Sequence, residues 1–333
     1  MHIDSTPHPY ESLTPDAVLD AVESMGYLSD ARILTLNSYE NRVYQVGIED
    51  QQPLIAKFYR PQRWSREQIL EEHQFTQALQ DADLPVVPPL ANDQGDTLHQ
   101  HGNFSFALFP RRGGHAPELE NLDNLFVLGR TMGRIHLLGN SLTFSQRPTI
   151  DVHSFGHLSR QYLLENDWLP MDLASEYQQV SEELLILVEK SFAAVDNMKL
   201  IALHGDCHPG NILWRDDTPN FVDFDDCRMG PAIQDLWMLI SGDYNQQTIQ
   251  INEVIEGYEE FLPFNRAELQ LIEPLRALRI MHYAAWLARR WQDPAFPTHF
   301  PWFNTQSYWL GHLMELKGLC QSVQLPALRV GAY

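Results

Sequence analysis

The sequence is poor in positive charge. Its 333 residues include 23 Lys and Arg against 44 Asp and Glu, which gives a formal net charge of −21 at pH 7. Proteins that bind nucleic acid or an anionic membrane surface present a basic face to the phosphates. We therefore expect neither nucleic acid nor a membrane as a partner. ATP is not excluded, because a few local cations and a bound metal can dominate a single cleft.

Cysteine and long apolar runs are also scarce. The three cysteines, Cys207, Cys227 and Cys320, are odd in number and show no C-x-x-C spacing, which is typical of a reduced intracellular protein. No stretch reaches the roughly 18 uninterrupted apolar residues of a membrane-spanning helix. Residues 1–15 lack the apolar core of a signal peptide. Together these features predict a cytoplasmic protein.

The first third of the chain is predicted to be rich in strands. Runs of β-branched and aromatic residues alternate with turn-forming residues, and two segments show the apolar stripe of a helix. Helices are expected at 14–26, where Thr14 and Pro15 suit a helix start, and at about 65–80. Strands are expected at 33–36, 42–46, 53–59, 96–101 and 104–109.

Beyond Arg111-Arg112-Gly113-Gly114 the pattern becomes helical, and we place the domain boundary there. Helices are predicted from about 122, at 177–192 and at 269–291, with two short strands at 212–214 and 221–223. We expect an α+β fold with two lobes. Residues 1–110 would form a small nucleotide-binding lobe, and 111–333 a larger helical lobe with the catalytic loop and the substrate cleft.

The residues that carry chemistry are concentrated at 203–226. Asp206 lies five residues before Asn211, and Asp223 follows a short apolar run. Phosphoryl transfer from ATP needs a carboxylate that orients a hydroxyl and oxygen ligands that hold Mg²⁺ on the phosphates. Asp206 can serve as the base, and Asn211 and Asp223 can hold the metal if their two strands form a hairpin. A His204-x-Asp206-x-His208 cluster for zinc or iron is the alternative.

This stretch resembles a known family. His204-Gly205-Asp206-x-His208-x-Gly210-Asn211 is similar to the catalytic loop of the aminoglycoside phosphotransferase and choline kinase family, distant relatives of the eukaryotic protein kinases. Val222-Asp223-Phe224-Asp225 stands where protein kinases carry D-F-G. The resemblance implies a protein-kinase-like fold, with Asp206 as catalytic base, Asn211 as a Mg²⁺ ligand, and Asp223 as a catalytic residue and Mg²⁺ ligand. It also implies that Asp235 braces the catalytic loop.

The N-terminal third contains candidates for the nucleotide-binding residues of such a kinase. Lys57, on a predicted strand, is placed to hold the α- and β-phosphates. Glu72 is the expected helix partner of Lys57, with Glu71 as the alternative. The segment 36–44 has no G-x-G-x-x-G pattern, so we expect the Ser38 hydroxyl and nearby backbone N–H groups to cover the phosphates. Arg42 is a further candidate.

Further segments resemble the bacterial stress response kinase A group, and the likeness runs over nearly the whole chain. They are residues 37–44, 57–61, 68–75 and 293–297. The resemblance implies a cytoplasmic serine/threonine protein kinase that uses ATP and Mg²⁺ and is linked to survival under stress. We expect a monomer whose acceptors are protein hydroxyls, its own included.

Three alternatives stay open at this point. A small-molecule kinase that acts on a cationic hydroxyl compound, such as an aminoglycoside or amino alcohol, would suit the acidic C-terminal lobe. A pseudokinase would bind without turnover, although Asp206, Asn211, Asp223 and Lys57 argue against it. Cys207 and the nearby Cys227 are candidates for a redox switch, against the simpler interpretation that both are unreactive core residues.

Overall fold

The computed structural model describes residues 8–331. They form two compact units: unit 1 comprises residues up to Ala116 with Ile212–Asp225 and Asp293–Ala295, and unit 2 comprises Pro117–Asn211, Asp226–Gln292 and the residues from Phe296 onward. Unit 1 is therefore discontinuous in sequence. The division into 1–110 and 111–333 stays a prediction about the functional lobes.

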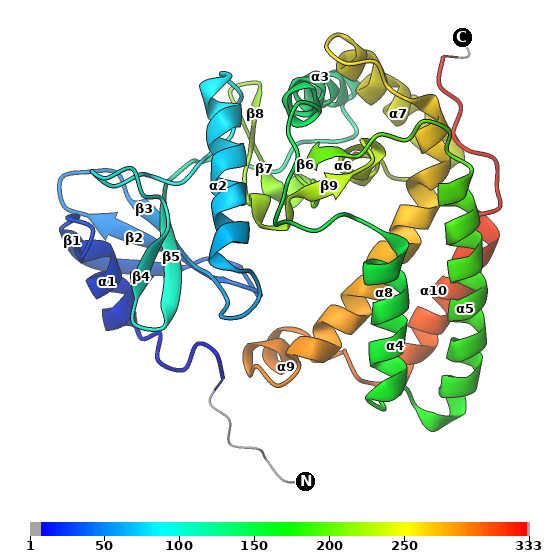
Figure 1. Ribbon diagram of the computed structural model, residues 1–333, viewed down its shortest axis with the longest axis horizontal. Helices are drawn as coiled ribbons and strands as arrows, with labels where there is room; N and C mark the ends of the chain where they lie inside the picture. The colour runs from blue at the N-terminus through cyan, green and yellow to red at the C-terminus, as the bar shows by residue number, and fades with distance from the viewer. Residues whose placement is uncertain (1–7, 332–333) are drawn as a thin grey trace. The chain divides into compact units, whose positions relative to one another are not determined.

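Unit 1 is built on a five-stranded antiparallel sheet in the order β1-β2-β3-β5-β4 (Figure 1). The predicted strands are present, with bounds shifted by a few residues. They are β1 (Ser29–Thr35), β2 (Arg42–Ile48), β3 (Leu54–Phe58), β4 (His99–His101) and β5 (Phe104–Pro110). Val46, Phe58 and Phe106 form a buried core with Val18 and Val22 of helix α1 (Pro15–Glu23). The sheet thus gains its hydrophobic stabilisation from one covering helix and the strands themselves.

The two helices of unit 1 begin where their caps predict. The Thr14 hydroxyl accepts a hydrogen bond from the backbone N–H of Ala17, and Pro15 occupies the first turn of α1. Helix α2 (Arg66–Asp81) begins with a capping box, in which Ser65 and Gln68 bond reciprocally to each other's backbone N–H. These local signals set the start of α2 and therefore the turn on which Glu72 lies.

A hairpin from the middle of the chain completes unit 1. Strands β7 (Ile212–Arg215) and β8 (Thr218–Phe221) pair antiparallel, and Phe221 bridges to Val86. The prediction of a strand at 221–223 was wrong, because the turn between β7 and β8 has only two residues. Asp216 and Asp217 both have left-handed φ values of 51° and 54°, as a two-residue type I′ turn requires. The second strand therefore starts and ends earlier.

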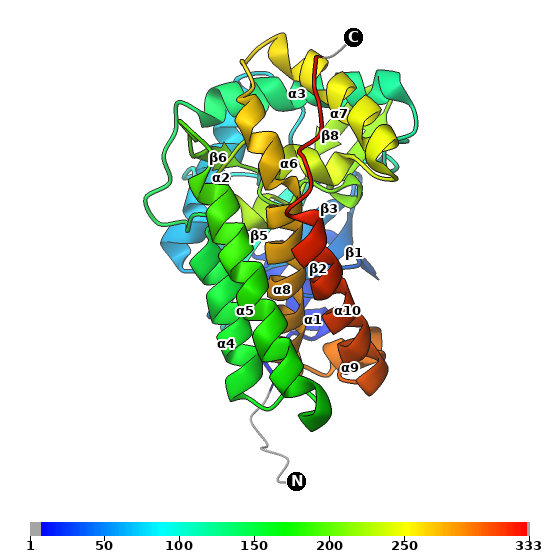
Figure 2. The same cartoon turned by 90° about the vertical axis from the view of Figure 1, so that its right-hand side faces the viewer.

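Unit 2 is mainly helical, and Figure 2 shows α4, α5, α8 and α10 running side by side. The predicted helix at 269–291 is divided, because a 3₁₀ segment (Arg266–Leu271) precedes α8. The α-helices of this unit are α3 (Leu122–Gly139), α4 (Leu158–Glu165), α5 (Met171–Ala193), α6 (Ile233–Leu236), α7 (Tyr244–Glu259), α8 (Ile272–Arg290), α9 (Ala295–His299) and α10 (Gln306–Ser322). Two short strands, β6 (Ile201–Leu203) and β9 (Arg228–Gly230), pair antiparallel. The other short segments of unit 2 are a π-helical turn (His153–His157) and 3₁₀ turns at Pro209–Asn211 and Trp237–Leu239, while a 3₁₀ turn at Phe224–Asp226 begins in unit 1.

Helices α3 and α7 approach each other closely because both carry glycine at the contact. A Cβ atom on Gly129 would lie 1.9 Å from the carbonyl oxygen of Val254, and one on Gly257 would lie 2.1 Å from that of Phe126. Neither position accepts a side chain without moving a backbone. This packing holds α3 in place, and α3 carries the buried His136, which contacts the Asp235 side chain of α6.

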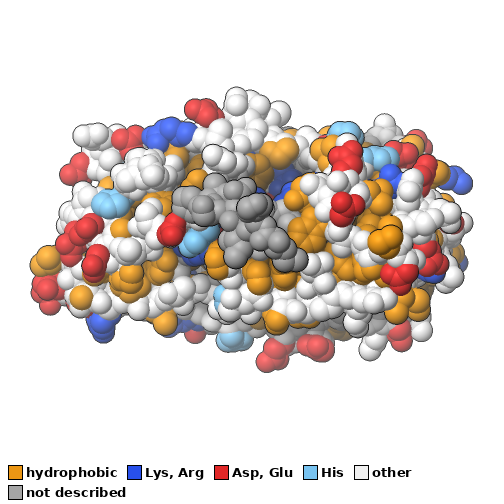
Figure 3. Space-filling view, turned by 90° about the horizontal axis from the view of Figure 1, so that it is seen from below, with side chains coloured by type: hydrophobic (Ala, Val, Ile, Leu, Met, Phe, Trp, Pro, Cys, Tyr) orange, Lys and Arg blue, Asp and Glu red, His pale blue; other side chains and the backbone are white. Residues whose placement is uncertain are grey.

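The surface of unit 2 exposes some large hydrophobic side chains, among them Met171, Trp302, Leu310 and Met314. Figure 3 shows one face of the molecule, on which hydrophobic side chains form patches between acidic ones. Within residues 8–331, none of the helices is long and apolar enough to cross a membrane.

Candidate active site

The catalytic loop of unit 2 follows β6 and is held by a buried carboxylate. Backbone N–H groups of His204 and Gly205 each donate to Asp235, at 2.8 Å, and His136 Nε2 lies 3.1 Å from the same side chain. Asp235 and His136 are fully buried. Gly205 has a φ of +86°, and a Cβ there would lie 2.1 Å from the carbonyl oxygen of Asp226. The predicted bracing contact of Asp235 is therefore present, and it fixes the backbone just before Asp206.

Asp206 presents its carboxylate to cationic and polar neighbours. Its side chain is one-quarter exposed, Oδ1 accepts a hydrogen bond from Arg279 Nη1, and Oδ2 lies 3.6 Å from His208 Nε2. His208 Nδ1 accepts from the backbone N–H of Gly210 at 3.0 Å, so His208 also closes the loop. The sequence interpretation did not identify Arg279, which reaches Asp206 from α8, 73 residues along the chain. No local pattern could have paired them.

Asn211 stands next to Asp206 through a direct hydrogen bond. Its Nδ2 donates to the Asp206 carbonyl oxygen at 3.0 Å, and its Oδ1 accepts none from the residues that the structure describes. Asn211 ends a 3₁₀ turn (Pro209–Asn211), and β7 starts at the next residue, where the strand at 212–214 was predicted. The amide oxygen suits a hard cation such as Mg²⁺.

In unit 1, Lys57 is the centre of a buried charge cluster. Its Nζ lies 3.0 Å from Asp223 Oδ1, 3.1 Å from Asp225 Oδ1 and 3.5 Å from Glu72 Oε1. Burial disfavours the charged ammonium, but the three carboxylates outweigh it and hold the pKa of Lys57 well above its usual value. Lys57 is therefore a permanent cation surrounded by an excess of negative charge.

The partners of Lys57 settle one open question and add one residue. Glu72, which is 3% exposed, makes the ion pair with Lys57, as expected over Glu71. Asp225 was quoted only as part of the motif, yet it is buried and forms ion pairs with Lys57 and Arg63. Its position depends on the 3₁₀ turn Phe224–Asp226, which turns the Asp225 side chain inward. Sequence spacing alone could not show that turn.

Asp223 has an unusual backbone conformation. It lies two residues beyond β8 with a φ of 60°, a left-handed value that is uncommon for residues other than glycine. Its side chain is 53% exposed, so the carboxylate is available to a ligand while Oδ1 contacts Lys57. Such outliers are concentrated at functional sites. In the sequence, Asn211 directly precedes β7 and Asp223 follows β8, so the two residues stand on either side of the β7–β8 hairpin in chain order.

Asp223 in unit 1 and Asn211 in unit 2 each carry a side-chain oxygen of the kind that Mg²⁺ prefers, and their joint role as metal ligands stays a prediction. Mg²⁺ is usually held by one or two carboxylates, substrate phosphates and water rather than by a complete protein cage. Among the residues that the structure describes, no three or more His, Cys, Asp or Glu side chains are grouped to hold a metal alone. His204, proposed above as one member of an alternative metal cluster, is fully buried.

The predicted phosphate-covering loop is closed by its own residues. Ser38 Oγ donates to the carbonyl oxygen of Asn41 at 3.1 Å, and the backbone N–H of Leu36 donates to Val43 at 2.9 Å. Arg42 donates to the Tyr39 carbonyl at 3.0 Å and lies 3.2 Å from Asp293. The guanidinium of Arg42 is thus engaged within unit 1, while the role of Ser38 toward phosphate stays a prediction.

The cysteines of the described chain are free and buried. Burial raises the pKa of the Cys207 thiol well above its usual value, and the nearby Asp235 and Asp206 raise it further. A thiol with a raised pKa carries little thiolate at neutral pH, and thiolate is the reactive form. The environment of Cys207 therefore favours the unreactive interpretation.

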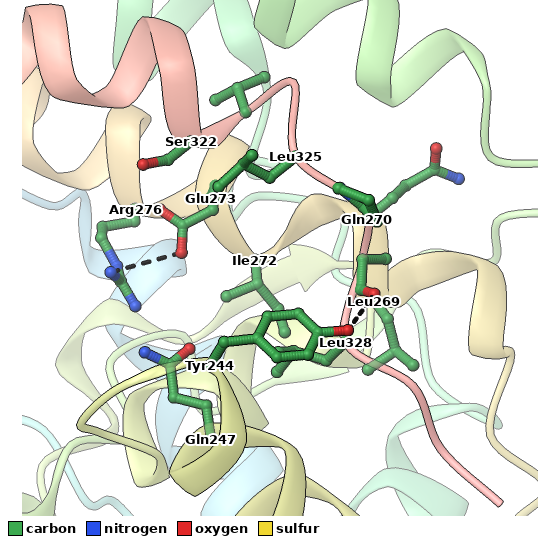
Figure 4. Close-up of a pocket in the computed structure, with 13 residues that line it drawn as sticks. Tyr244, Gln247, Leu269, Gln270, Ile272, Glu273, Arg276, Ser322, Leu325 and Leu328 are labelled. Atoms are coloured by element: carbon green, nitrogen blue, oxygen red, sulfur yellow. Dashed lines mark hydrogen bonds and ion pairs between the residues drawn. The ribbon is translucent and has the colours of Figure 1, made fainter. Parts of the chain in front are cut away.

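A separate pocket of about 230 Å³ lies in unit 2, between the start of α7, the start of α8 and the C-terminal residues (Figure 4). In the close-up, Arg276 reaches Glu273 and the Tyr244 hydroxyl donates to the carbonyl oxygen of Ala327, at 3.2 Å. None of the predicted site residues lines it.

Comparison with known proteins supplies the family. Residues 32–272 match the model of the phosphotransferase enzyme family (APH). The chain belongs to this family. Stress response kinase A of Escherichia coli (strain K12) is 44% identical to this phosphotransferase over 321 residues, which cover 96% of the chain and 97% of the relative. The serine/threonine protein kinase RdoA of Salmonella typhimurium is 45% identical over 300 residues, 90% of each chain.

Solved structures show the same fold at low identity. An amicoumacin kinase in complex with AMP-PNP, Ca²⁺ and Ami superposes with a TM-score of 0.70 at 19% identity, covering 97% of this chain and 96% of that one. A microcompartment-associated aminopropanol kinase superposes with a TM-score of 0.69 at 18% identity, covering 92% and 98%. The predicted kinase-like fold and the resemblance to the stress response kinase A group are confirmed. The phosphotransferase is an ATP-dependent kinase.

Proposed function

We propose that this phosphotransferase is a serine/threonine protein kinase of the cytoplasm that acts in a stress response. The observation that carries the proposal is the 44% identity, over nearly the full length of both chains, to a protein named stress response kinase A. A second relative, 45% identical, is named a serine/threonine protein kinase. We infer that ATP and a protein hydroxyl, its own included, are the substrates, and that the enzyme works as a monomer.

We propose these roles for the site residues. Asp206 accepts the proton of the acceptor hydroxyl, while Lys57, held by Glu72, binds the α- and β-phosphates. Asp223 and Asn211 supply oxygen ligands to Mg²⁺, which when bound neutralises the charge of the phosphates. The Ser38 loop covers the phosphates. The cluster around Lys57 supports this assignment, because three carboxylates around one ammonium keep it charged and leave negative charge for a cation.

The competing proposal is a kinase for a cationic small molecule. A cationic acceptor would be expected to meet an acidic surface beside the catalytic base. In unit 2 the contacts of Asp206 are instead the Arg279 guanidinium and the His208 ring. The Arg279 guanidinium beside the catalytic base disfavours a cationic acceptor such as an aminoglycoside or an amino alcohol, and this supports a protein acceptor.

Transfer of labelled phosphate from ATP tests both proposals. The wild type should label a generic protein acceptor or itself, and neither an aminoglycoside nor an amino alcohol. Asp206→Asn should lower turnover by about 10²–10⁴-fold and leave ATP affinity largely unchanged. Asp216→Asn is the matched control, because Asp216 lies in the exposed hairpin turn and Asn tolerates its left-handed φ. Full activity of Asp206→Asn would refute the assigned base, and labelling of the small molecules alone would favour the competing proposal.

A further inference from the structure

Arg279 stands apart from the other arginines around the catalytic loop. Its guanidinium meets the carboxylate of Asp206, its side chain is 42% exposed, and the described residues offer it no second polar partner. Arg228, by contrast, is 10% exposed and donates to both the carboxylate and the carbonyl oxygen of Asp226. Arg276, one turn earlier on α8, is paired with Glu273 at 3.3 Å. Arg279 therefore keeps most of its donors available at the surface beside Asp206.

The reaction brings two anions to the place where Arg279 lies. The carboxylate of Asp206 and the phosphoryl group of ATP must both approach the oxygen of one acceptor hydroxyl, and like charges at that distance repel each other. A guanidinium carries five N–H donors in a planar fork that matches the oxygens of a phosphoryl group. One N–H donor of Arg279 already holds Asp206 Oδ1. The remaining donors of the guanidinium can therefore reach a phosphoryl group that lies beside this carboxylate.

We propose that Arg279 is a catalytic residue that binds the phosphoryl group during its transfer. The inference rests on the proposed function, in which Asp206 is the base. In the step, the bond between the acceptor oxygen and phosphorus forms while the bond from phosphorus to the ADP oxygen breaks. The hydroxyl proton moves to Asp206 Oδ2, and ADP leaves with the electron pair of the broken bond. Arg279 donates to the phosphoryl oxygens throughout and offsets their repulsion by Asp206.

Binding of a phosphoryl mimic tests this contact without measuring turnover. In the presence of Mg²⁺, aluminium fluoride beside bound ADP imitates the phosphoryl group in transit, so it should increase the ADP affinity of the wild type. We expect Arg279→Gln to reduce this increase by about 10²-fold, as loss of one charge-stabilising donor does in other enzymes. Arg279→Lys should retain part of it, because an ammonium supplies charge without the fork. Arg276→Gln is the matched control on the same helix and should behave as the wild type.

Turnover supplies the second measurement. Arg279→Gln should lower kcat by about 10²–10³-fold with the KM for ATP nearly unchanged. If aluminium fluoride increases ADP affinity equally in the wild type and Arg279→Gln, Arg279 does not touch the phosphoryl group and the inference is wrong. An inactive Asp206→Asn together with a fully active Arg279→Gln would overturn the inference alone. An active Asp206→Asn would instead overturn the proposed function.

Discussion

Replacing Glu268 with Gln should remove a measurable part of the pH dependence of the protein's stability. Glu268 is 3% exposed in the 3₁₀ segment before α8, and its Oε2 accepts a hydrogen bond from the backbone N–H of Ile233 at 3.1 Å. Burial raises the pKa of this carboxyl from an ordinary 4.5 to about 7, although the N–H groups of Ile233 and Ala232 act to lower it. Gln keeps the acceptor oxygen and never ionises.

The sign and size follow from the two pKa values of Glu268. The pKa of Glu268 is higher in the folded state than in the unfolded state. The contribution of Glu268 to folding stability is therefore complete below about pH 4.5 and is lost as the pH rises to about 7. The difference, 7 − 4.5 = 2.5 pH units, corresponds to roughly 3 kcal/mol at about 1.4 kcal/mol per unit. That is a large share of a typical folding free energy of about 5–15 kcal/mol.

Urea unfolding at about pH 4.5 and about pH 8 measures the effect. The stability of Glu268→Gln relative to the wild type should rise by up to roughly 3 kcal/mol between the two conditions. Glu183→Gln, on the exposed face of α5, is the matched control and should follow the wild type at both. Parallel pH profiles for Glu268→Gln and the wild type would refute the reasoning, since Glu268 would then have an ordinary pKa.

Three further substitutions or treatments test other parts of the structure. Asp235→Asn should cost about 1–3 kcal/mol in urea unfolding and lower phosphate transfer, because its amide would face a backbone N–H donor; unchanged stability and transfer would contradict the bracing role. Gly129→Ala should destabilise the fold by about 1–3 kcal/mol, because the new Cβ would overlap the carbonyl of Val254; a melting temperature equal to that of the wild type would refute the close packing. Cys207 should react with a thiol reagent only after unfolding, because burial raises its pKa; rapid labelling of the native protein would disprove this.

Features with a local cause were predictable from the sequence. Thr14 caps the helix that it was expected to start, Ser65 caps the helix expected at about 65–80, and the alternating strands of unit 1 form the expected sheet. Glu72 faces Lys57 because the cap fixes the helix start, and so the turn on which a residue at that distance lies. Asp235 was assigned its brace through the family resemblance, and its contacts agree.

Features that depend on distant contacts or on rare backbone conformations were not predictable. Arg279 meets Asp206 only because α8 packs within unit 2 against elements far away in sequence. Asp223 was expected at a strand end, but its left-handed φ places it beyond β8. Asp225 is drawn inward by two cations, Lys57 and Arg63, that come from elsewhere in unit 1. Periodicity and spacing carry no information about such pairings.

The discontinuity of unit 1 has a consequence for how the protein is made on the ribosome. Arg60 is 5% exposed and lies between Glu40 and Asp293, which follows it by 233 residues. At a synthesis rate of roughly 5–20 residues per second, the nascent sheet waits roughly 10–50 s for this second carboxylate. Until Asp293 has been synthesised, the Arg60 guanidinium can form its ion pair with Glu40 but not the one with Asp293. An N-terminal fragment that stops at residue 116 would keep this incomplete state permanently.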